Sequence, residues 1–200
     1  MMKRGIFRSG LTVFFMLQLA ATVALADQAP DCLGNNGQSI SVNDGQVLQW
    51  ETTTPNQYLA RAHVTGNVVE LYPDQNGHNH FAIQIGPNSS DRLEVVYNQD
   101  FGTVPNPAVG DSVEACGDYI TSTAQAGPYP PSPCSAIIHW VHASDSAKHP
   151  SGYLMINGTV YGGFPGQAPS PAQTGQPPQN DNDNGQPGYC SHRAHKRHEC

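Results

Sequence analysis

Apolar and polar residues alternate in short runs along the middle of this chain, and clusters of turn-forming residues separate the runs. Between residues 80 and 85, for example, Phe81, Ile83 and Ile85 share one face. A period of two residues is typical of a half-buried β-strand. We therefore expect six or seven short strands, at residues 62–72, 80–85, 93–97, 113–120, 135–142, 153–156 and 159–161.

The turn signals between these runs indicate antiparallel connections. The last two runs flank Asn157-Gly158, the strongest short signal for a β-hairpin. No segment keeps a helical period over three turns. The pattern predicts an all-β fold at residues 56–162, namely a small antiparallel barrel similar to an OB-fold, with a β-sandwich as the alternative.

The first 26 residues are expected to be a signal peptide. Lys3, Arg4 and Arg8 precede a mostly apolar stretch, and Ala24-Leu25-Ala26 fits a small-x-small cleavage site. We therefore expect an exported protein, periplasmic or secreted, with no integral membrane segment after cleavage.

The regions that flank the predicted barrel differ from it in composition. Residues 27–55 are a polar extension whose apolar cluster, Val47, Leu48 and Trp50, is expected to pack on the core as a strand or a short helix. Residues 163–189 are rich in Pro, Gln, Gly, Asn and Asp, a composition typical of a disordered linker. Residues 190–200 form a basic tail rich in histidine and cysteine.

Charge argues against nucleic acid as a partner of the core. After removal of the signal peptide, six Lys and Arg residues remain against sixteen acidic residues, and three of these six lie in the tail. The rest of the chain has only Arg61, Arg92 and Lys148 as basic residues. A protein that binds the phosphate backbone needs a basic face, which this core lacks.

The five cysteines are expected to form disulfides in an oxidising compartment. Several pairings are open. We favour Cys116 with Cys134, because they flank a proline-rich insertion between two predicted strands, and Cys190 with Cys200 in the tail. Cys32 is then the unpaired cysteine, free or bonded to a partner.

The nine histidines are the main candidates for chemistry, because imidazole is the commonest side-chain metal ligand. His78 and His80 have the same parity, which directs both away from the face that carries Phe81. His139 and His142 have opposite parity, so they converge only if a bulge or the strand end lies between them.

His149 follows these two histidines, with Asp145 between. A set made of His78, His139, His142, His149 and Asp145 suits Zn²⁺ or Cu²⁺, or acid–base chemistry in which Asp145 orients an imidazole. The alternative is that one histidine is buried with a backbone carbonyl while the others are exposed. In the tail, the spacing of His192, His195 and His198 indicates a second element that binds metal or anions.

Residues 63–162 resemble domain of unknown function family 3465, a family of small exported bacterial proteins. The motifs that carry the resemblance occur in order: Gly66-x-Val68-Val69, Leu71-x-Pro73-Asp74, Gly77-His78, Val109-Gly110-Asp111-x-Val113-Glu114, Gly117-x-Tyr119, and Ile138-His139-Trp140-x-His142 with Asp145, His149, Gly152, Gly158 and Tyr161. The resemblance implies the fold and export, and it gives His78, His139, His142 and His149 more weight than His80. The chain departs from the family at Tyr97, where a histidine is expected, and at residues 122–134, which are an insertion. The family brings no established activity.

Three functions are consistent with these observations. The first is an exported binding module that holds a divalent transition metal, Zn or Cu, through the histidine cluster. The second is a hydrolase that uses the same cluster, although the chain has no Gly-x-Ser-x-Gly elbow and no phosphate-binding loop. The third is an adaptor that binds an unknown protein and whose histidines are structural.

Overall fold

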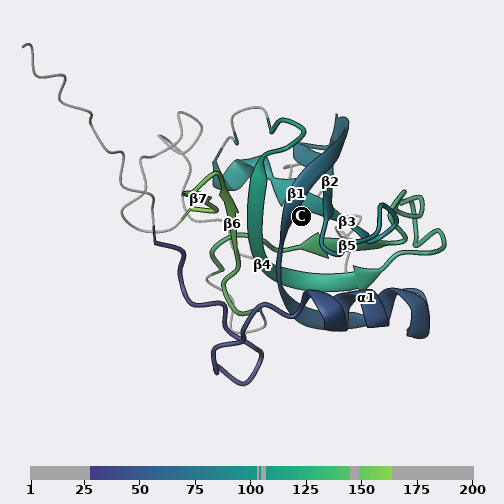
Figure 1. Ribbon diagram of the computed structural model, residues 1–200, viewed down its shortest axis with the longest axis horizontal. Coiled ribbons are helices and arrows are strands. Elements are labelled where there is room, and N and C mark those ends of the chain that lie inside the picture. Colours follow the sequence, from purple (N-terminus) through teal and green to yellow (C-terminus); the bar gives the residue numbers. More distant parts are fainter. Residues whose placement is uncertain (1–27, 103, 105–106, 145–148, 164–200) are drawn as a thin grey trace, which may run out of the picture.

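A computed structural model describes residues 28–102, 104, 107–144 and 149–163 (Figure 1). The expected signal peptide, the linker, the tail histidines His192, His195 and His198, the Cys190–Cys200 pair and Asp145 lie outside the described residues. The described ranges contain one α-helix, one short 3-10 helix and seven strands: α1 (Asp44–Thr53), β1 (Leu59–Gln75), β2 (His78–Gln84), β3 (Arg92–Asn98), η1 (Gln99–Phe101), β4 (Ser112–Thr121), β5 (Ala136–His139), β6 (Tyr153–Ile156) and β7 (Thr159–Tyr161).

The strands confirm the segments expected from the alternating pattern. The two tightest hairpins have the backbone that their sequences predict, since Asn76-Gly77 and Asn157-Gly158 all have positive φ. This conformation matches the twist of antiparallel strands and is favoured by Asn-Gly. The strand expected at residues 135–142 is shorter and ends at His139.

All seven strands belong to one sheet with the order β1-β2-β3-β5-β4-β6-β7, and β1 also pairs with β4. This extra pairing gives the sheet a partly ring-like arrangement, visible in Figure 1 as strands that curve around a common interior. The expectation of a purely antiparallel sheet is wrong at one place, because β3 and β5 are parallel. The alternating pattern cannot reveal this, because it shows which face a residue occupies but not which strand edges meet.

The interior is filled by the apolar residues that alternate along the strands. The buried cluster takes residues from all of the strands in the ring, among them Val64, Phe81, Ile83, Leu93, Val95, Tyr97, Ala115, Tyr119 and Ile138. The residues between them in the sequence face outward. This alternation fixes which histidines can meet on the outside of the sheet.

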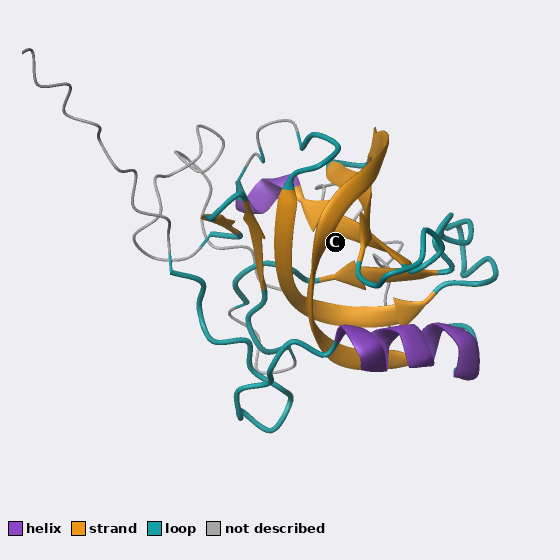
Figure 2. Ribbon diagram, in the orientation of Figure 1, coloured by secondary structure: helices purple, strands orange, loops and turns teal. Residues whose placement is uncertain are grey.

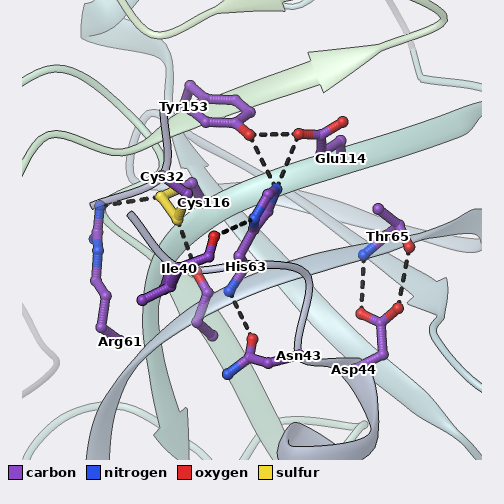
Figure 3. Close-up of polar contacts among 11 residues, drawn as sticks. Cys32, Ile40, Asn43, Asp44, Arg61, His63, Thr65, Glu114, Cys116 and Tyr153 are labelled. Atoms are coloured by element: carbon purple, nitrogen blue, oxygen red, sulfur yellow. Dashed lines mark hydrogen bonds and ion pairs between the residues drawn. A yellow bond between two sulfur atoms is a disulfide. The ribbon is translucent and has the colours of Figure 1, made fainter. Parts of the chain in front are cut away.

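The apolar cluster of the N-terminal extension forms α1, which packs against the ring beside β1 and β4 (Figure 2). Val47 is fully buried, and the Trp50 ring lies 5.3 Å from the Tyr119 ring. The start of the helix is tied to β1, because the Asp44 carboxylate accepts hydrogen bonds from the backbone N–H and the hydroxyl of Thr65 (Figure 3). Pro55 comes two residues after the end of the helix and cannot continue it.

A disulfide joins Cys32 to Cys116, so the expected Cys116–Cys134 pair and the unpaired state of Cys32 are wrong (Figure 3). Cys116 lies on β4 with the parity of Glu114 and Asp118, and this outer face meets the N-terminal segment. Cys134 is a free thiol at the end of the insertion, 3.5 Å from the Tyr72 hydroxyl. Nearness in the sequence is therefore a poor guide to this pairing.

Replacing both Cys32 and Cys116 with serine is expected to lower the free energy of unfolding by about 2–5 kcal/mol, because the bridge closes a long loop in the unfolded chain. The two cysteines are 84 residues apart. Urea unfolding of the double variant measures the loss. The Cys134→Ser variant is the matched control and should unfold like the original chain. Equal stability of the double variant and the control would contradict the bridge.

Candidate functional site

The outward-facing residues of β2, β3 and β5 form a continuous row of polar side chains. His78 and His80 come from β2, Glu94 from β3 and His139 from β5, and all four line the same depression in the surface. Phe81 and Ile83 of β2 lie in the core instead. The predicted orientation of His78 and His80, away from the face with Phe81, is therefore confirmed.

The end of β5 turns the chain so that further aromatic rings meet this row. Trp140 follows the last residue of the strand and has a φ of 49°, a strained conformation for a bulky residue. Its ring lies 4.6 Å from the His139 ring and stacks on His149 at 4.7 Å. Gly117 and Gly152 permit this turn, because a Cβ at either position would lie within 2.5 Å of the carbonyl oxygen of His139 or Trp140.

The structure brings His78 and His139 side by side, and the buried His142 interacts electrostatically with both; we call these three residues the histidine cluster. The His78 and His139 rings are 5.6 Å apart, and His142 stacks on Phe101 at 3.7 Å. The exposed fractions of the three residues are 4%, 4% and 1%. Convergence of His139 and His142 requires a bulge or a strand end between them, and β5 ends at His139.

Each residue of the histidine cluster has a ring nitrogen without a hydrogen-bond partner in the described chain. Nδ1 of His78 bonds to the Asn76 carbonyl at 3.0 Å, and Nδ1 of His142 bonds to the Ala143 carbonyl at 2.8 Å. Each Nδ1 therefore carries the proton, which leaves a lone pair on Nε2. Within the described part of the chain, no partner reaches Nε2 of His78, Nε2 of His142 or Nδ1 of His139, although all three atoms are buried.

Burial keeps these imidazoles neutral at neutral pH. It lowers the pKa of His78, lowers the pKa of His142 to about 4, and lowers the pKa of His139 well below its ordinary value. Repulsion between the histidines acts in the same direction, since His78, His142, His80 and His149 each disfavour a charge on His139. A neutral imidazole is the form that binds a metal ion.

Two carboxylates beside the cluster were not predicted from the sequence. Asp118 bonds to Nδ1 of His149 at 3.1 Å and to the Arg61 guanidinium at 3.0 Å. Glu94 bonds to Nδ1 of His80 at 2.7 Å. The signal that could identify them is strand parity, because Asp118 is the register partner of His139 and Glu94 lies on the outward-facing side of β3.

A pocket of about 240 Å³ lies directly above this row. Val96 and Ile137 contribute apolar groups from the sheet, and His78 and His139 contribute their imidazoles. The insertion at residues 122–134 covers the pocket. Further lining residues come from the end of β1 and the turn that follows it. The full lining is Tyr72, Pro73, Gln75, Asn76, His78, His80, Glu94, Val96, Ser122, Tyr129, Pro130, Pro131, Ser132, Pro133, Ile137 and His139.

His63 provides a contrast on another part of the outer face (Figure 3). Its Nδ1 bonds to the Ile40 carbonyl at 3.0 Å, and its Nε2 lies 2.9 Å from the Glu114 carboxylate and 3.0 Å from the Tyr153 hydroxyl. Both ring nitrogens of His63 thus have partners. This arrangement fixes the N-terminal segment on the sheet and leaves no nitrogen for a ligand.

The separation of the His78 and His139 rings can be compared with that of two imidazoles bound to one metal ion. Two imidazoles on one tetrahedral Zn²⁺ have ring centres about 5 Å apart, close to the 5.6 Å between His78 and His139. Among the described residues, no three His, Cys, Asp or Glu side chains already form a group that could hold a metal ion.

Comparison of the chain with known protein families, with curated proteins and with solved structures gave no match. None of the helices in the described ranges is long and apolar enough to cross a membrane.

Acid is expected to destabilise the fold through His142. Its pKa in the folded chain is about 4, against 6.5 for an ordinary histidine, so between these values the unfolded chain binds a proton that the folded chain excludes. The contribution of neutral His142 to the free energy of unfolding is fully present above pH 6.5. It decreases by about 3 kcal/mol as the pH falls to 4. His139 acts in the same direction.

Urea unfolding at neutral pH and near pH 4.5 measures this effect. The His142→Gln variant should lose a large part of the pH dependence, whereas the His80→Gln control should retain it. An unchanged pH dependence in His142→Gln would show that His142 does not titrate in this way.

Proposed function

We propose that this protein binds a divalent transition metal, Zn²⁺ or Cu²⁺, through His78, His139 and His142. The observation that carries the proposal is the set of three buried imidazole nitrogens without a hydrogen-bond partner in the described chain. A buried polar atom left without a partner costs about 1–3 kcal/mol. An ion bound by all three nitrogens would remove this cost.

The anchoring of the rings supports the same proposal. Histidines that bind a metal commonly donate their other ring N–H to a carbonyl or a carboxylate, which fixes the ring and its tautomer. His78 and His142 both have such a bond to a backbone carbonyl. A donor set of neutral imidazoles suits Zn²⁺ and Cu²⁺ rather than Mg²⁺ or Ca²⁺. Binding would draw the third ring toward the pair formed by His78 and His139.

We assign His149 a supporting position. Its Nδ1 is held by Asp118, and its ring stacks on Trp140. In this arrangement Asp118 has the orienting role that the sequence suggested for Asp145. His149 would then position Trp140 and, through it, the end of β5 where His139 lies.

The test is a titration of the full chain with Zn²⁺ and with Co²⁺, in a background where His192, His195 and His198 are replaced by alanine so that the tail does not contribute. We expect about one equivalent to bind, and His78→Ala, His139→Ala and His142→Ala to weaken binding by about 100-fold each. The visible spectrum of the Co²⁺ form reports coordination by nitrogen directly.

His63→Gln is the matched control, because His63 lies on the outer face of the same sheet with both ring nitrogens occupied. It should bind the metal normally. Absence of binding in the tail-substituted chain, or equal binding by His139→Ala, would refute the metal proposal. An adaptor with structural histidines would then replace it.

We propose, as a separate point, that the ring of five strands is a closed barrel of the OB-fold type. The pairing of β1 with both β2 and β4, the parallel contact of β3 with β5 and the single apolar interior support this. The pocket lies on the outer face of β2 and β3, between the β1–β2 turn and the β4–β5 loop, which is where OB-folds bind ligands. An experimental structure tests the closure.

Export and membership of domain of unknown function family 3465 are also proposals. The buried disulfide between Cys32 and Cys116 supports an oxidising compartment, because such bonds are rare where thiols are kept reduced. N-terminal sequencing of the protein from its native host tests whether the chain begins at Asp27.

A further inference from the structure

The floor of the pocket is a row of side chains that are neighbours across three strands. His80 of β2 is the register partner of Tyr72 on β1 and of Val96 on β3. All three residues line the pocket, and so does Ile137 of β5. His80 therefore lies in the floor between an aromatic and an aliphatic side chain.

The opposite wall is the insertion at residues 122–134, which is fixed to the sheet at Ser132. The Ser132 hydroxyl donates to the Glu94 carboxylate and lies 3.1 Å from the Ala136 carbonyl oxygen. The backbone N–H of Ser132 also donates to the Ser122 carbonyl, at 3.0 Å. These bonds hold the proline-rich loop over the sheet.

The pocket has room for a single ring between apolar walls. Its volume of about 240 Å³ equals the space of roughly eight water molecules, which is small for a drug-sized ligand. Tyr129, Pro130 and Pro131 contribute apolar surface from the loop, and Val96 and Ile137 contribute it from the sheet. One aromatic ring suits a space of this size and character.

His80 differs from the histidine cluster because its ring is open to the pocket. Its side chain is 17% exposed, whereas the unpartnered nitrogens of His78 and His139 are buried. Nδ1 of His80 lies 2.7 Å from the Glu94 carboxylate. A carboxylate only accepts hydrogen bonds, so in the neutral ring Nδ1 carries the proton and Nε2 carries the lone pair. Among the described residues no hydrogen-bond partner reaches Nε2 of His80, which leaves this atom as the acceptor for a ligand.

The charges around this acceptor favour a neutral ligand that donates a hydrogen bond. None of the described residues that line the pocket is Lys or Arg. The carboxylate of the lining, Glu94, is engaged at one oxygen by His80 and at the other by Ser132, and the whole chain has a formal net charge of −7. An anionic head group would therefore meet a negative field without a cation to bind it. A hydroxyl on the ring can donate to Nε2 of His80 and needs no charge.

We propose that this pocket binds a phenol, whose ring lies between the sheet and the proline-rich loop and whose hydroxyl donates to Nε2 of His80. Glu94 is a positioning residue, which fixes the ring of His80 and is itself held by Ser132. The inference goes beyond the proposed metal function and does not depend on it, because no nitrogen of the histidine cluster takes part in holding the ligand.

The experiment measures the binding of phenol and of fluorobenzene to the full chain by ligand-observed NMR, in the presence of a metal chelator. The two probes have nearly the same size, but only phenol has a hydrogen-bond donor. Phenol should bind about fivefold or more tightly than fluorobenzene, because it makes one additional hydrogen bond. Benzoate, the anionic probe, should bind more weakly than phenol.

Two variants separate the hydroxyl from the ring. His80→Leu removes the acceptor and keeps much of the side-chain volume, so it should bind phenol and fluorobenzene equally, with the affinity for fluorobenzene unchanged. Val96→Phe fills the pocket from the sheet and should weaken the binding of both probes by about tenfold. Val109→Phe is the matched control, because Val109 is exposed and outside the pocket. It should bind both probes normally.

Four results would overturn the inference. Phenol that binds no more tightly than fluorobenzene contradicts the role of the hydroxyl, and a His80→Leu chain that still prefers phenol contradicts the role of Nε2. Binding that is insensitive to Val96→Phe places the ligand elsewhere. Benzoate that binds more tightly than phenol shows a site for anions.

The chelator separates this inference from the proposed function. Phenol that binds only without the chelator overturns the inference, because a metal ion would then hold the ligand. A chain that takes up no Zn²⁺ or Co²⁺ but binds phenol through His80 refutes the proposed function and leaves the phenol site in place.

Discussion

The whole arrangement depends on one strand that serves two edges of the sheet. Residues 59–67 of β1 pair with β4, and residues 67–75 pair with β2. The partners change beside Gly66, where a Cβ atom would lie 2.3 Å from the Gln84 carbonyl oxygen. Only a residue without a side chain lets β1 pass this close to β2. The bend that follows brings the sheet back toward itself and leaves an inside and an outside.

His63 and the histidine cluster differ in how many of their ring nitrogens have a hydrogen-bond partner. His63 has a partner for each ring nitrogen and connects the N-terminal segment to β1 and β4. The histidine cluster has one anchored nitrogen on each of His78 and His142 and an unpartnered buried nitrogen on all three residues, within the described chain. The three residues of the histidine cluster are buried and His63 is half-buried. The hydrogen bonds of the ring nitrogens separate the two groups further.

The sequence predicted the elements well and their partners poorly. Alternation located the strands and the outward orientation of His78 and His80, because a two-residue period is a local property of the chain. It could not reveal that Cys116 meets Cys32, that β5 lies parallel to β3, or that Asp118 and Glu94 hold His149 and His80. Each of these depends on contacts between strands that are distant in sequence. The insertion at residues 122–134 read as a departure from a family pattern, whereas in three dimensions it covers the pocket.

The bridge between Cys32 and Cys116 has a consequence for the order of events during synthesis. Cys32 emerges 84 residues before its partner, and β1, β2 and β3 are all made in the interval. Oxidation during that time cannot yield the native bond, and once Cys134 has emerged it is a competing partner for either cysteine. The native bond therefore requires a Cys32 thiol that is available once Cys116 has been made, and the pairing of β1 with β4 places Cys116 on the strand beside residues 59–67. The bond thus ties the first described segment of the chain to a strand made more than eighty residues later.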